Sequence, residues 1–434
     1  MMGQLVARGH QLTSHPEEAE VIVVNTCSFI RPAQQESVDT ILEMARHKRS
    51  GTLKKLIVAG CLVERYGEEI RRRLPEVDAV LGANEVPQIV AACEGRPVTA
   101  DSRRPYLYNH LSPRVRATPP HYAYIKIAEG CDHSCSFCII PQLRGPYRSR
   151  TIESVVTEAA RLFAQGVREI NLVSQDTTAY GEDLGRRDGL ARLLARLARI
   201  ETPQPVWIRF LYAHPSKITP RLLETMAAHP ALVRYLDVPF QHSSARVLRR
   251  MRRGGSGKAF LRLLEKIRRA LPGVAIRTSL MVGFPGETPE DFQDLCRFVE
   301  AARFDHLGVF SYDDEETCAS HRLEGKIPAR IVYNRKRRLL AIQRRISRAL
   351  NRQQVGHAAP VLVEGPSRET DLLWEARTPA QAPEIDSLCL VNDFLGAPPR
   401  AGQSRRLRVT AAHDYELIGT LLPDEGETHG EQLA

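Results

Sequence analysis

The first hundred residues alternate short apolar runs with longer amphipathic stretches. Apolar runs at 21–24, 56–59 and 78–81 have the length and composition of strands that are buried on both faces. The stretches with helical spacing lie at about 32–47, 64–74 and 85–94. This alternation predicts a doubly wound parallel α/β domain over residues 1–111.

The same alternation resumes after a Pro- and Arg-rich segment, 103–120, which we interpret as a linker. Six apolar runs follow, and a helical stretch comes after each of them. The strands are expected at 122–128, 168–173, 206–211, 235–238, 274–282 and 306–310. Six β/α units predict an open, partial parallel barrel within residues 117–352, with its site at the C-terminal ends of the strands.

The pattern changes again after a long basic amphipathic helix, which is predicted over residues 328–352. Short strands with Pro, Gly and Asp between them are expected at 361–363, 388–391, 407–410 and 416–421. They predict a small antiparallel β-barrel within residues 353–424. The fold class is therefore α/β, with this barrel as a C-terminal addition.

Charge is distributed unevenly along the chain. The whole sequence has a net charge of +10, but residues 360–434 hold 6 Arg, no Lys and 13 acidic residues. A basic body thus carries an acidic C-terminal module. The basic face of the 328–352 helix is either a solvated surface or a contact for ribosomal or transfer RNA. No run is apolar and long enough to span a membrane, so we expect no membrane association.

Three cysteines, Cys131, Cys135 and Cys138, follow the apolar run at 122–128 with the spacing C-x3-C-x2-C. Three thiolates on one loop can hold three irons of a 4Fe–4S cluster and leave the fourth iron open to a substrate. Zinc is the main alternative, but structural zinc usually takes four ligands in two pairs. Three buried thiols without metal are the remaining alternative.

Cys27 and Cys61 each follow a predicted strand of the first domain. The C-terminal ends of parallel strands form sites together, so these thiols are either ligands of a second cluster or buried packing residues. The other four, Cys93, Cys296, Cys318 and Cys389, are isolated, and we interpret them as packing residues. Nine cysteines without disulfide-type spacing fit a reducing cytoplasm.

Other polar loops leave the predicted barrel strands at the same end. Gln175 and Asp176 follow the second strand, and a glycine-rich turn containing Gly283, Gly286 and Glu287 follows the fifth. The turn either lets backbone approach a nucleotide-like ligand or is an ordinary turn. The arginines after the cysteine loop, Arg144 and the pair in 148–150, are candidates for binding a carboxylate or phosphate, or are a solvated charge run.

The motifs together resemble the methylthiotransferase branch of the radical S-adenosylmethionine (SAM) enzymes, and within it the type that modifies the small-subunit ribosomal protein S-twelve. The resemblance spans nearly the whole chain. It is carried by Val24-Asn-Thr-Cys27-Ser-Phe-Ile30, Gly60-Cys61-Leu-Val-Glu-Arg65, Cys131-Asp-His-Ser-Cys135-Ser-Phe-Cys138, Gln175-Asp-Thr-Thr178, Trp207-Ile-Arg-Phe210, Met251-Arg-Arg-Gly254, Val282-Gly-Phe-Pro-Gly-Glu287 and Ala382-Pro-Glu-Ile-Asp386.

The resemblance implies an N-terminal cluster domain, a radical SAM barrel and a C-terminal TRAM domain. It implies that Cys131, Cys135 and Cys138 hold a 4Fe–4S cluster that binds SAM and cleaves it to a radical. It also implies a second cluster that carries the sulfur. The radical would take hydrogen from the β-carbon of a ribosomal-protein aspartate, which then receives the methylthio group. Unactivated C–H cleavage calls for such a cofactor. An electron donor and a sulfur donor are also needed, and no motif identifies them.

The family's N-terminal domain begins with a strand and a Gly-Cys loop that gives the second cluster its third ligand. The given sequence starts in what resembles the helix after that loop, Met1 to Gly9. Only Cys27 and Cys61 are therefore present as ligands of the second cluster. We expect the sequence to be truncated at its start.

Two other functions compete with the modification of a ribosomal protein. A methylthiotransferase acting on adenosine in transfer RNA would use the same cofactors, but the acidic C-terminal module is unsuited to RNA. Asp132-His133 and the Ala-Pro-Glu-Ile-Asp386 motif also favour the protein-modifying type. The second alternative is a cluster- and SAM-binding protein that inserts no sulfur, because the first N-terminal cysteine is absent.

Overall fold

The computed structural model of the chain describes residues 1–98 and 106–423 and divides into two compact units. The first unit contains 1–117, 128–150 and 313–322, and the second contains 118–127, 151–312 and 323–434. Part of the predicted linker, 103–105, lies outside the described residues, and so does residue 424 at the end of the predicted barrel domain.

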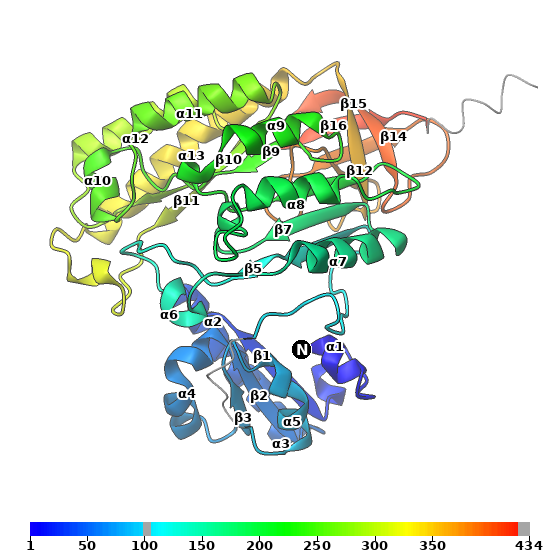
Figure 1. Cartoon of the computed structure of the whole chain (residues 1–434), viewed down its shortest axis with the longest axis vertical. Coiled ribbons are helices and arrows are strands. Elements are labelled where there is room, and N and C mark those ends of the chain that lie inside the picture. The colour runs from blue at the N-terminus through cyan, green and yellow to red at the C-terminus, as the bar shows by residue number, and fades with distance from the viewer. Residues whose placement is uncertain (99–105, 424–434) are drawn as a thin grey trace, which may run out of the picture. The chain divides into compact units, whose positions relative to one another are not determined.

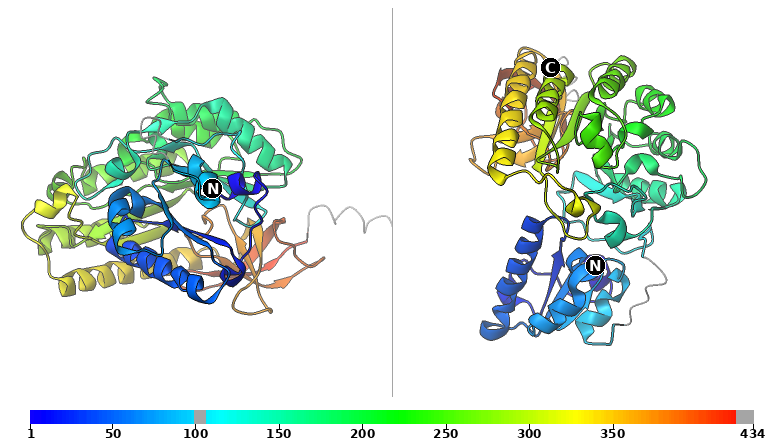
Figure 2. Two further views of the ribbon diagram at one scale, coloured as in Figure 1. Left: turned by 90° about the horizontal axis from the view of Figure 1, so that it is seen from below. Right: turned by 90° about the vertical axis from the view of Figure 1, so that its left-hand side faces the viewer.

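The first unit is built on a parallel sheet of three strands in the order β1-β2-β3. The strands are β1 (Val21–Thr26), β2 (Lys55–Gly60) and β3 (Ala79–Leu81). The helices are α1 (Met2–Val6), α2 (Arg31–Ala45), α3 (His47–Ser50), α4 (Cys61–Arg73) and α5 (Ile89–Glu94), with 3-10 turns η1 (Pro16–Glu18) and η2 (Val86–Gln88). Helices cover both faces of the sheet (Figure 2), so the doubly wound prediction is confirmed. The predicted 85–94 helix is shorter, because its first turn is η2.

Each face of this sheet has its own apolar core. Val24 and Val58 pack against Ile41 of α2 and Leu62 of α4 on one face. The other face packs against α1 and α5; its buried residues are Leu5, Ile57, Ala59, Leu81, Ile89, Ala92 and Cys93. Cys93 is therefore a packing residue, as the sequence predicted.

The second unit begins with a partial parallel barrel. Its strands are β4 (Tyr122–Lys126), β7 (Glu169–Val173), β8 (Trp207–Phe210), β9 (Tyr235–Asp237), β10 (Ala275–Val282) and β11 (His306–Ser311). The helices are α7 (Ile152–Ala164), α8 (Gly189–Leu197), α9 (Pro220–Ala228), α10 (Ala245–Arg250), α11 (Gly257–Ala270), α12 (Pro289–Ala302) and α13 (Ala329–Arg352), with turns η3 (Thr177–Ala179) and η4 (Pro215–Lys217). The helices lie outside the strands (Figure 1).

All six predicted barrel strands are present, but they form two sheets of three, β4-β7-β8 and β11-β10-β9. Ile208 of β8 forms an isolated parallel bridge with Leu232, which lies just before β9. The predicted strand at 122–128 is also divided. β4 ends at Lys126, and Ala128 belongs to a separate short strand of the first unit.

The C-terminal part of the second unit is a closed barrel with the strand order β12-β13-β14-β16-β15. Its strands are β12 (Ala358–Pro366), β13 (Trp374–Arg377), β14 (Cys389–Phe394), β15 (Ser404–Ala412) and β16 (Leu417–Leu421). The predicted barrel is confirmed, although β14 pairs with β16 in parallel. Strand β13 was missed because half of its four residues are charged, and Arg377 is buried by ion pairs rather than by apolar contacts.

Buried ion pairs hold this barrel against the strands of the parallel barrel. Arg377 binds Glu169 of β7 at 2.7 Å and Glu364 of β12 at 2.6 Å, and Arg209 of β8 binds Glu169 at 2.9 Å. Glu169, Arg209 and Arg377 have fully buried side chains. The two barrels therefore form one continuous body within the second unit.

No helix of the part of the chain that the structure describes is long and apolar enough to cross a membrane. The long helix α13 matches the predicted 328–352 segment. Its apolar residues Leu339, Ile342 and Ile346 are buried, and it contacts β11 and α12.

Candidate active site

The three cysteines of the C-x3-C-x2-C motif lie on one loop of the first unit. The loop leaves β5 (Ala128–Glu129), runs into α6 (Ile140–Arg144) and returns as β6 (Arg148–Ser149), which pairs antiparallel with β5. Gly130 has a φ of +84°, and a Cβ there would lie 2.1 Å from the carbonyl oxygen of Pro146. Glycine is thus needed for the loop to close tightly.

Two backbone hydrogen bonds hold the conformation of the cysteine loop. Cys131 donates its N–H to Gly145 at 3.2 Å, and Cys138 donates its N–H to Cys135 at 3.2 Å. Cys131 is buried and the other two are half-buried. Burial, together with the charges of Cys135 and Cys131, raises the pKa of Cys138 to about 12. Cys131 and Cys135 are therefore near enough to Cys138 to affect the pKa of its thiol.

The three thiols do not form a site for a single metal ion. Among residues 1–98 and 106–423, no three His, Cys, Asp or Glu side chains are gathered closely enough to hold one metal ion. The thiol set has the chemistry that iron–sulfur clusters require, so it fits the implied cofactor. The assignment of Cys131, Cys135 and Cys138 as its ligands stays a prediction.

Cys27 and Cys61 lie at neighbouring strand ends of the first unit, as the sequence predicted. In the parallel register of β1 and β2, Thr26 is opposite Gly60, and the two cysteines are the next residues. Burial raises the pKa of Cys61, and the charge of Cys27 adds to that shift. The structure thus brings these two thiols together; their binding to a metal is a prediction.

The sequence did not predict that Cys61 contacts the loop of the three cysteines. Arg144 of α6 donates to Cys61 Sγ at 3.0 Å, and Cys61 packs with Ile139, Leu143 and Cys318. Cys318, interpreted above as an isolated packing residue, is therefore buried against a candidate ligand. No local motif marks this contact, because the residues come from three separate segments.

The arginines that the sequence offered as anion-binding candidates make contacts within the chain. Arg144 also lies 3.6 Å from Glu129. Arg148 donates to the carbonyl oxygens of Pro146 at 3.2 Å and Arg144 at 3.4 Å. The Arg150 guanidinium lies 4.5 Å from the ring centroid of Tyr108. These contacts brace the loop.

In the second unit, the Asp176 loop is held by its own hydrogen bonds at the C-terminal end of β7. Asp176 Oδ1 accepts from the Thr178 N–H at 3.0 Å and from its hydroxyl at 2.6 Å. The Thr178 hydroxyl oxygen accepts from the His214 N–H at 2.9 Å. Gln175 precedes this turn. The loops after β7 and β8 are thus tied together at one end of the barrel.

The glycine-rich turn follows β10 at the same end. Glu287 is buried, and its carboxylate accepts from the Gly283 N–H at 2.6 Å and from Arg335 at 2.8 Å. A Cβ on Gly283 would lie 2.4 Å from Val332, and one on Gly286 would lie 3.0 Å from Arg250. Both glycines thus permit close packing inside the chain. Burial raises the pKa of Glu287, although Arg335 and the backbone N–H groups oppose this.

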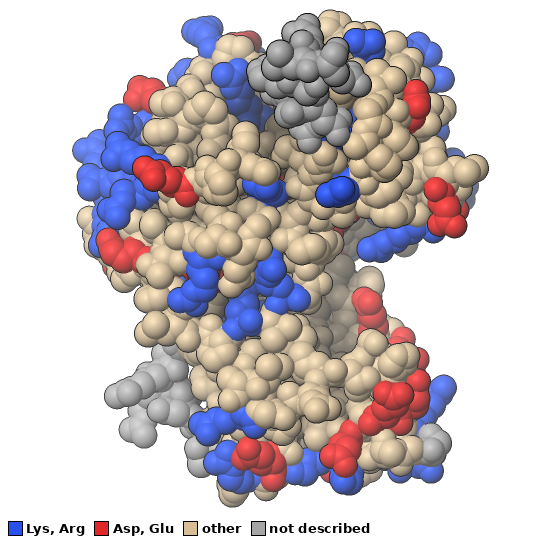
Figure 3. Space-filling model, turned by 90° about the vertical axis from the view of Figure 1, so that its right-hand side faces the viewer, with Lys and Arg blue, Asp and Glu red and all other residues tan. Residues whose placement is uncertain are grey.

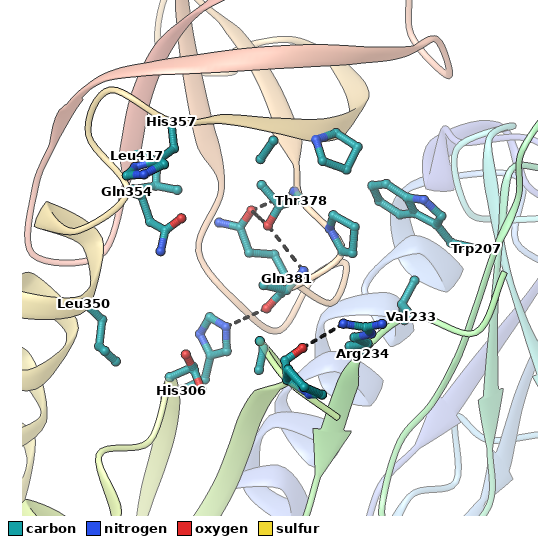
Figure 4. Close-up of a pocket in the computed structure, with 18 of the residues that line it drawn as sticks. Trp207, Val233, Arg234, His306, Leu350, Gln354, His357, Thr378, Gln381 and Leu417 are labelled. Carbon is teal, nitrogen blue, oxygen red and sulfur yellow. Dashed lines mark hydrogen bonds between the residues drawn. The ribbon is translucent and has the colours of Figure 1, made fainter. Parts of the chain in front are cut away.

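A large cavity lies at the opposite end of the barrel strands (Figure 4). Its volume is about 760 Å³, and it is lined by Trp207, Arg234, His306, His357 and Gln381, among others. Trp207 and His306 are the first residues of β8 and β11, so the cavity is at the N-terminal strand ends. His306 Nε2 donates a hydrogen bond to the carbonyl oxygen of Ala380 at 2.7 Å. Reactions in this type of barrel take place at the other end.

Three family models match successive parts of the chain. Residues 1–82 match the Uncharacterized protein family UPF0004, residues 125–299 match the Radical SAM superfamily, and residues 355–422 match the TRAM domain. These matches agree with the order of domains that the resemblance implied.

A solved structure supports the fold. TsrM from Kitasatospora setae, a radical S-adenosylmethionine methyltransferase with cobalamin and a [4Fe-4S] cluster bound, superposes with a TM-score of 0.53. The alignment covers 68% of this chain and 64% of that chain, at 16% sequence identity. At this identity the similarity concerns the fold alone.

Relatives match at much higher identity. The proteins named ribosomal protein uS12 methylthiotransferase RimO from Solibacter usitatus and Koribacter versatilis are 66% and 50% identical to this chain. Each alignment covers 97% of this chain, and 91% and 93% of the relatives. The protein of the same name from Myxococcus xanthus is 47% identical over 97% of this chain and 88% of its own length. The chain therefore belongs to the RimO family of radical SAM methylthiotransferases.

Proposed function

We propose that this chain transfers a methylthio group to an aspartate of ribosomal protein uS12, the S-twelve protein introduced above, at the β-carbon of the side chain. The observation that carries the proposal is the 66% identity over 97% of the chain with a protein named for this activity. Residues 1–111, 117–352 and 353–424 would be its cluster, radical SAM and TRAM domains. A ribosomal substrate places the reaction in the cytoplasm.

The family implies a 4Fe–4S cluster and SAM as cofactors, and we assign their ligands from the residues above. Cys131, Cys135 and Cys138 would hold the cluster, which supplies the electron needed to cleave SAM. Cys27 and Cys61 would contribute to a second cluster. Arg144, at the end of the helix that follows the cysteine loop, donates to Cys61 Sγ and would orient that thiol.

The loops at the C-terminal strand ends would bind SAM. The Gly283 to Glu287 turn would contact it through backbone groups, because the Glu287 carboxylate is engaged by Arg335 and Gly283. Asp176 and Gln175 would contribute side chains from the neighbouring loop. Because these loops are held by hydrogen bonds within the chain, they would help to exclude water from the reaction.

The test is incubation of the reconstituted chain with uS12, SAM and a reductant, followed by mass analysis of the protein. We expect one hydrogen of uS12 to be replaced by one methylthio group. Transfer RNA in a parallel reaction tests the adenosine alternative, and its modification instead of uS12 would contradict the proposal. SAM cleavage without any sulfur transfer would favour the cluster-binding alternative.

A further inference from the structure

Arginine side chains on the outside of the second unit surround a small hollow. Its volume is about 340 Å³, and its lining includes Arg186, Arg192, Arg196 and Arg221. Figure 3 shows that Lys and Arg gather in patches on the face it displays rather than being spread evenly. We infer that this hollow binds phosphate groups of RNA, so that the enzyme docks on the RNA that surrounds its substrate protein in the ribosome. The inference rests on the proposed function.

Helix α8 contributes both short side chains and positive charges to the lining of the hollow. Arg192 and Arg196 are four residues apart and lie on one face of the helix, where both are exposed. Ala191 and Ala195 precede them and line the hollow with short side chains. Two like charges at this spacing weaken a helix, so helix stability does not explain the pair.

Carboxylates do not neutralise the α8 side of the hollow. Among the residues that the structure describes, Arg186, Arg192 and Arg196 make no ion pair, and the one acidic residue in the lining is Glu153. Glu153 lies in the first turn of α7, where a negative charge favours the helix. Arg221 pairs with Glu224 at 3.8 Å. The hollow thus keeps at least three guanidinium groups for a ligand.

The basic helix α13 provides the contrast. Arg344 and Arg348 lie 3.8 and 3.4 Å from Asp414, and Arg345 lies 3.8 Å from Glu300. Arg335 is buried on Glu287. The sequence left α13 as either a solvated surface or an RNA contact, and four of its nine basic side chains have acidic partners in the structure. The hollow differs because arginines without an ion pair among the described residues gather around one concave site.

The position and chemistry of the hollow suit an RNA backbone. It is lined by the first turns of α7 and α9, which follow the C-terminal strand ends where the reaction is expected. A guanidinium binds phosphate through two parallel hydrogen bonds. None of the described lining residues is aromatic, so we expect contacts to phosphates that do not depend on base sequence.

The experiment compares two triple variants with the same loss of charge. One carries Arg186→Gln, Arg192→Gln and Arg196→Gln, and the matched control carries Arg344→Gln, Arg345→Gln and Arg348→Gln. Binding to purified small ribosomal subunits is measured over a salt series, with free uS12 as the substrate in a separate activity assay. A third variant, with Arg186→Lys, Arg192→Lys and Arg196→Lys, tests whether positive charge alone is sufficient for binding.

For the α8 variant we expect affinity for the subunits to fall roughly tenfold or more at low salt, and the salt slope to decrease by about 2–3. The Lys variant should recover most of the slope, and the α13 control should keep it. Modification of free uS12 should be equal in all four proteins. An unchanged slope in the α8 variant, or an equal loss in the α13 control, would overturn the inference. Failure of the unsubstituted enzyme to modify free uS12 would instead contradict the proposed function.

Discussion

The cysteine loop of the first unit and the glycine-rich turn of the second unit differ in whether their buried polar side chains have partners within the chain. Burial raises the pKa of Cys61 and Cys138, so both thiols stay protonated near neutral pH until a metal is bound. Glu287, in contrast, already has a guanidinium and a backbone N–H as partners. Folding alone thus completes the turn, whereas under the proposed function the loop would be completed only when its cofactor binds. Changes to the thiols should therefore affect cofactor content, and changes around the turn should affect stability.

The largest effect is expected from replacing Cys131, Cys135 and Cys138 by Ala together. The variant should contain about four irons per chain fewer after anaerobic reconstitution and should no longer cleave SAM, because three ligands of a 4Fe–4S cluster are gone. Iron and sulfide analysis measures this. Cys296→Ala, which removes a buried thiol from α12, is the control and should keep its iron. Unchanged iron in the triple variant would show that these thiols hold no cluster.

The sequence predicted the elements well because each signal was local. The apolar runs of β1, β2 and the six barrel strands, and the spacing of the loop cysteines, are all contained in short segments. The placement of Cys27 beside Cys61 was predicted too, because parallel strands end at one edge.

Contacts between distant segments could not be predicted. Strand β13 was missed because Arg377 is buried only through Glu169 and Glu364, which lie far away in sequence. The contact of Cys61 with Arg144 and Cys318 was missed for the same reason. Glu287 was part of a turn that the sequence offered as a contact for a nucleotide-like ligand, and no sequence pattern indicates that Arg335, on a later helix, binds its carboxylate.

The next largest effect is expected on the stability of the second unit, from the loss of its buried ion pairs. Arg377→Met removes one of the two guanidinium groups that neutralise Glu169 and Glu364, so the buried cluster is left with Arg209 and an excess of negative charge. We expect a loss of about 3–5 kcal/mol in the free energy of unfolding, measured by urea denaturation. Iron content should not change. Arg297→Ala, which breaks an exposed ion pair with Asp294 on α12, should cost less than about 1 kcal/mol.

A smaller effect on stability is expected from a buried ion pair in the first unit, between Arg65 and Glu315. Arg65 binds both oxygens of Glu315, at 2.6 and 2.9 Å, and both side chains are 7% exposed. Hydrogen bonds from Arg65 lower the pKa of Glu315 to about 2, although burial opposes them. Because the pKa is lowered by folding, this contribution is fully present above about pH 4.5 and is lost as pH falls toward 2.

Glu315→Gln should therefore reduce stability by about 1.5–3 kcal/mol near neutral pH, the usual size of hydrogen bonds to charged groups. Its melting temperature should approach that of the unsubstituted chain as pH falls to about 2. Thermal unfolding across this pH range measures both. Glu316→Gln, at an exposed neighbouring position, is the control. A difference between variant and parent that stayed constant with pH would contradict the assigned cause.

The smallest effect concerns the end of the glycine-rich turn. Thr288 caps α12: its hydroxyl accepts from the Asp291 N–H at 3.2 Å, and Asp291 accepts from the Thr288 N–H at 2.9 Å. Thr288→Ala should cost about 1 kcal/mol in unfolding free energy, and Thr288→Ser should cost less because it keeps the cap. SAM affinity, measured by calorimetry, should change by less than about twofold, because Arg335 and Gly283 still hold Glu287. A larger loss of SAM affinity in Thr288→Ala than in Thr288→Ser would mean that the cap, and not the ion pair, fixes the turn.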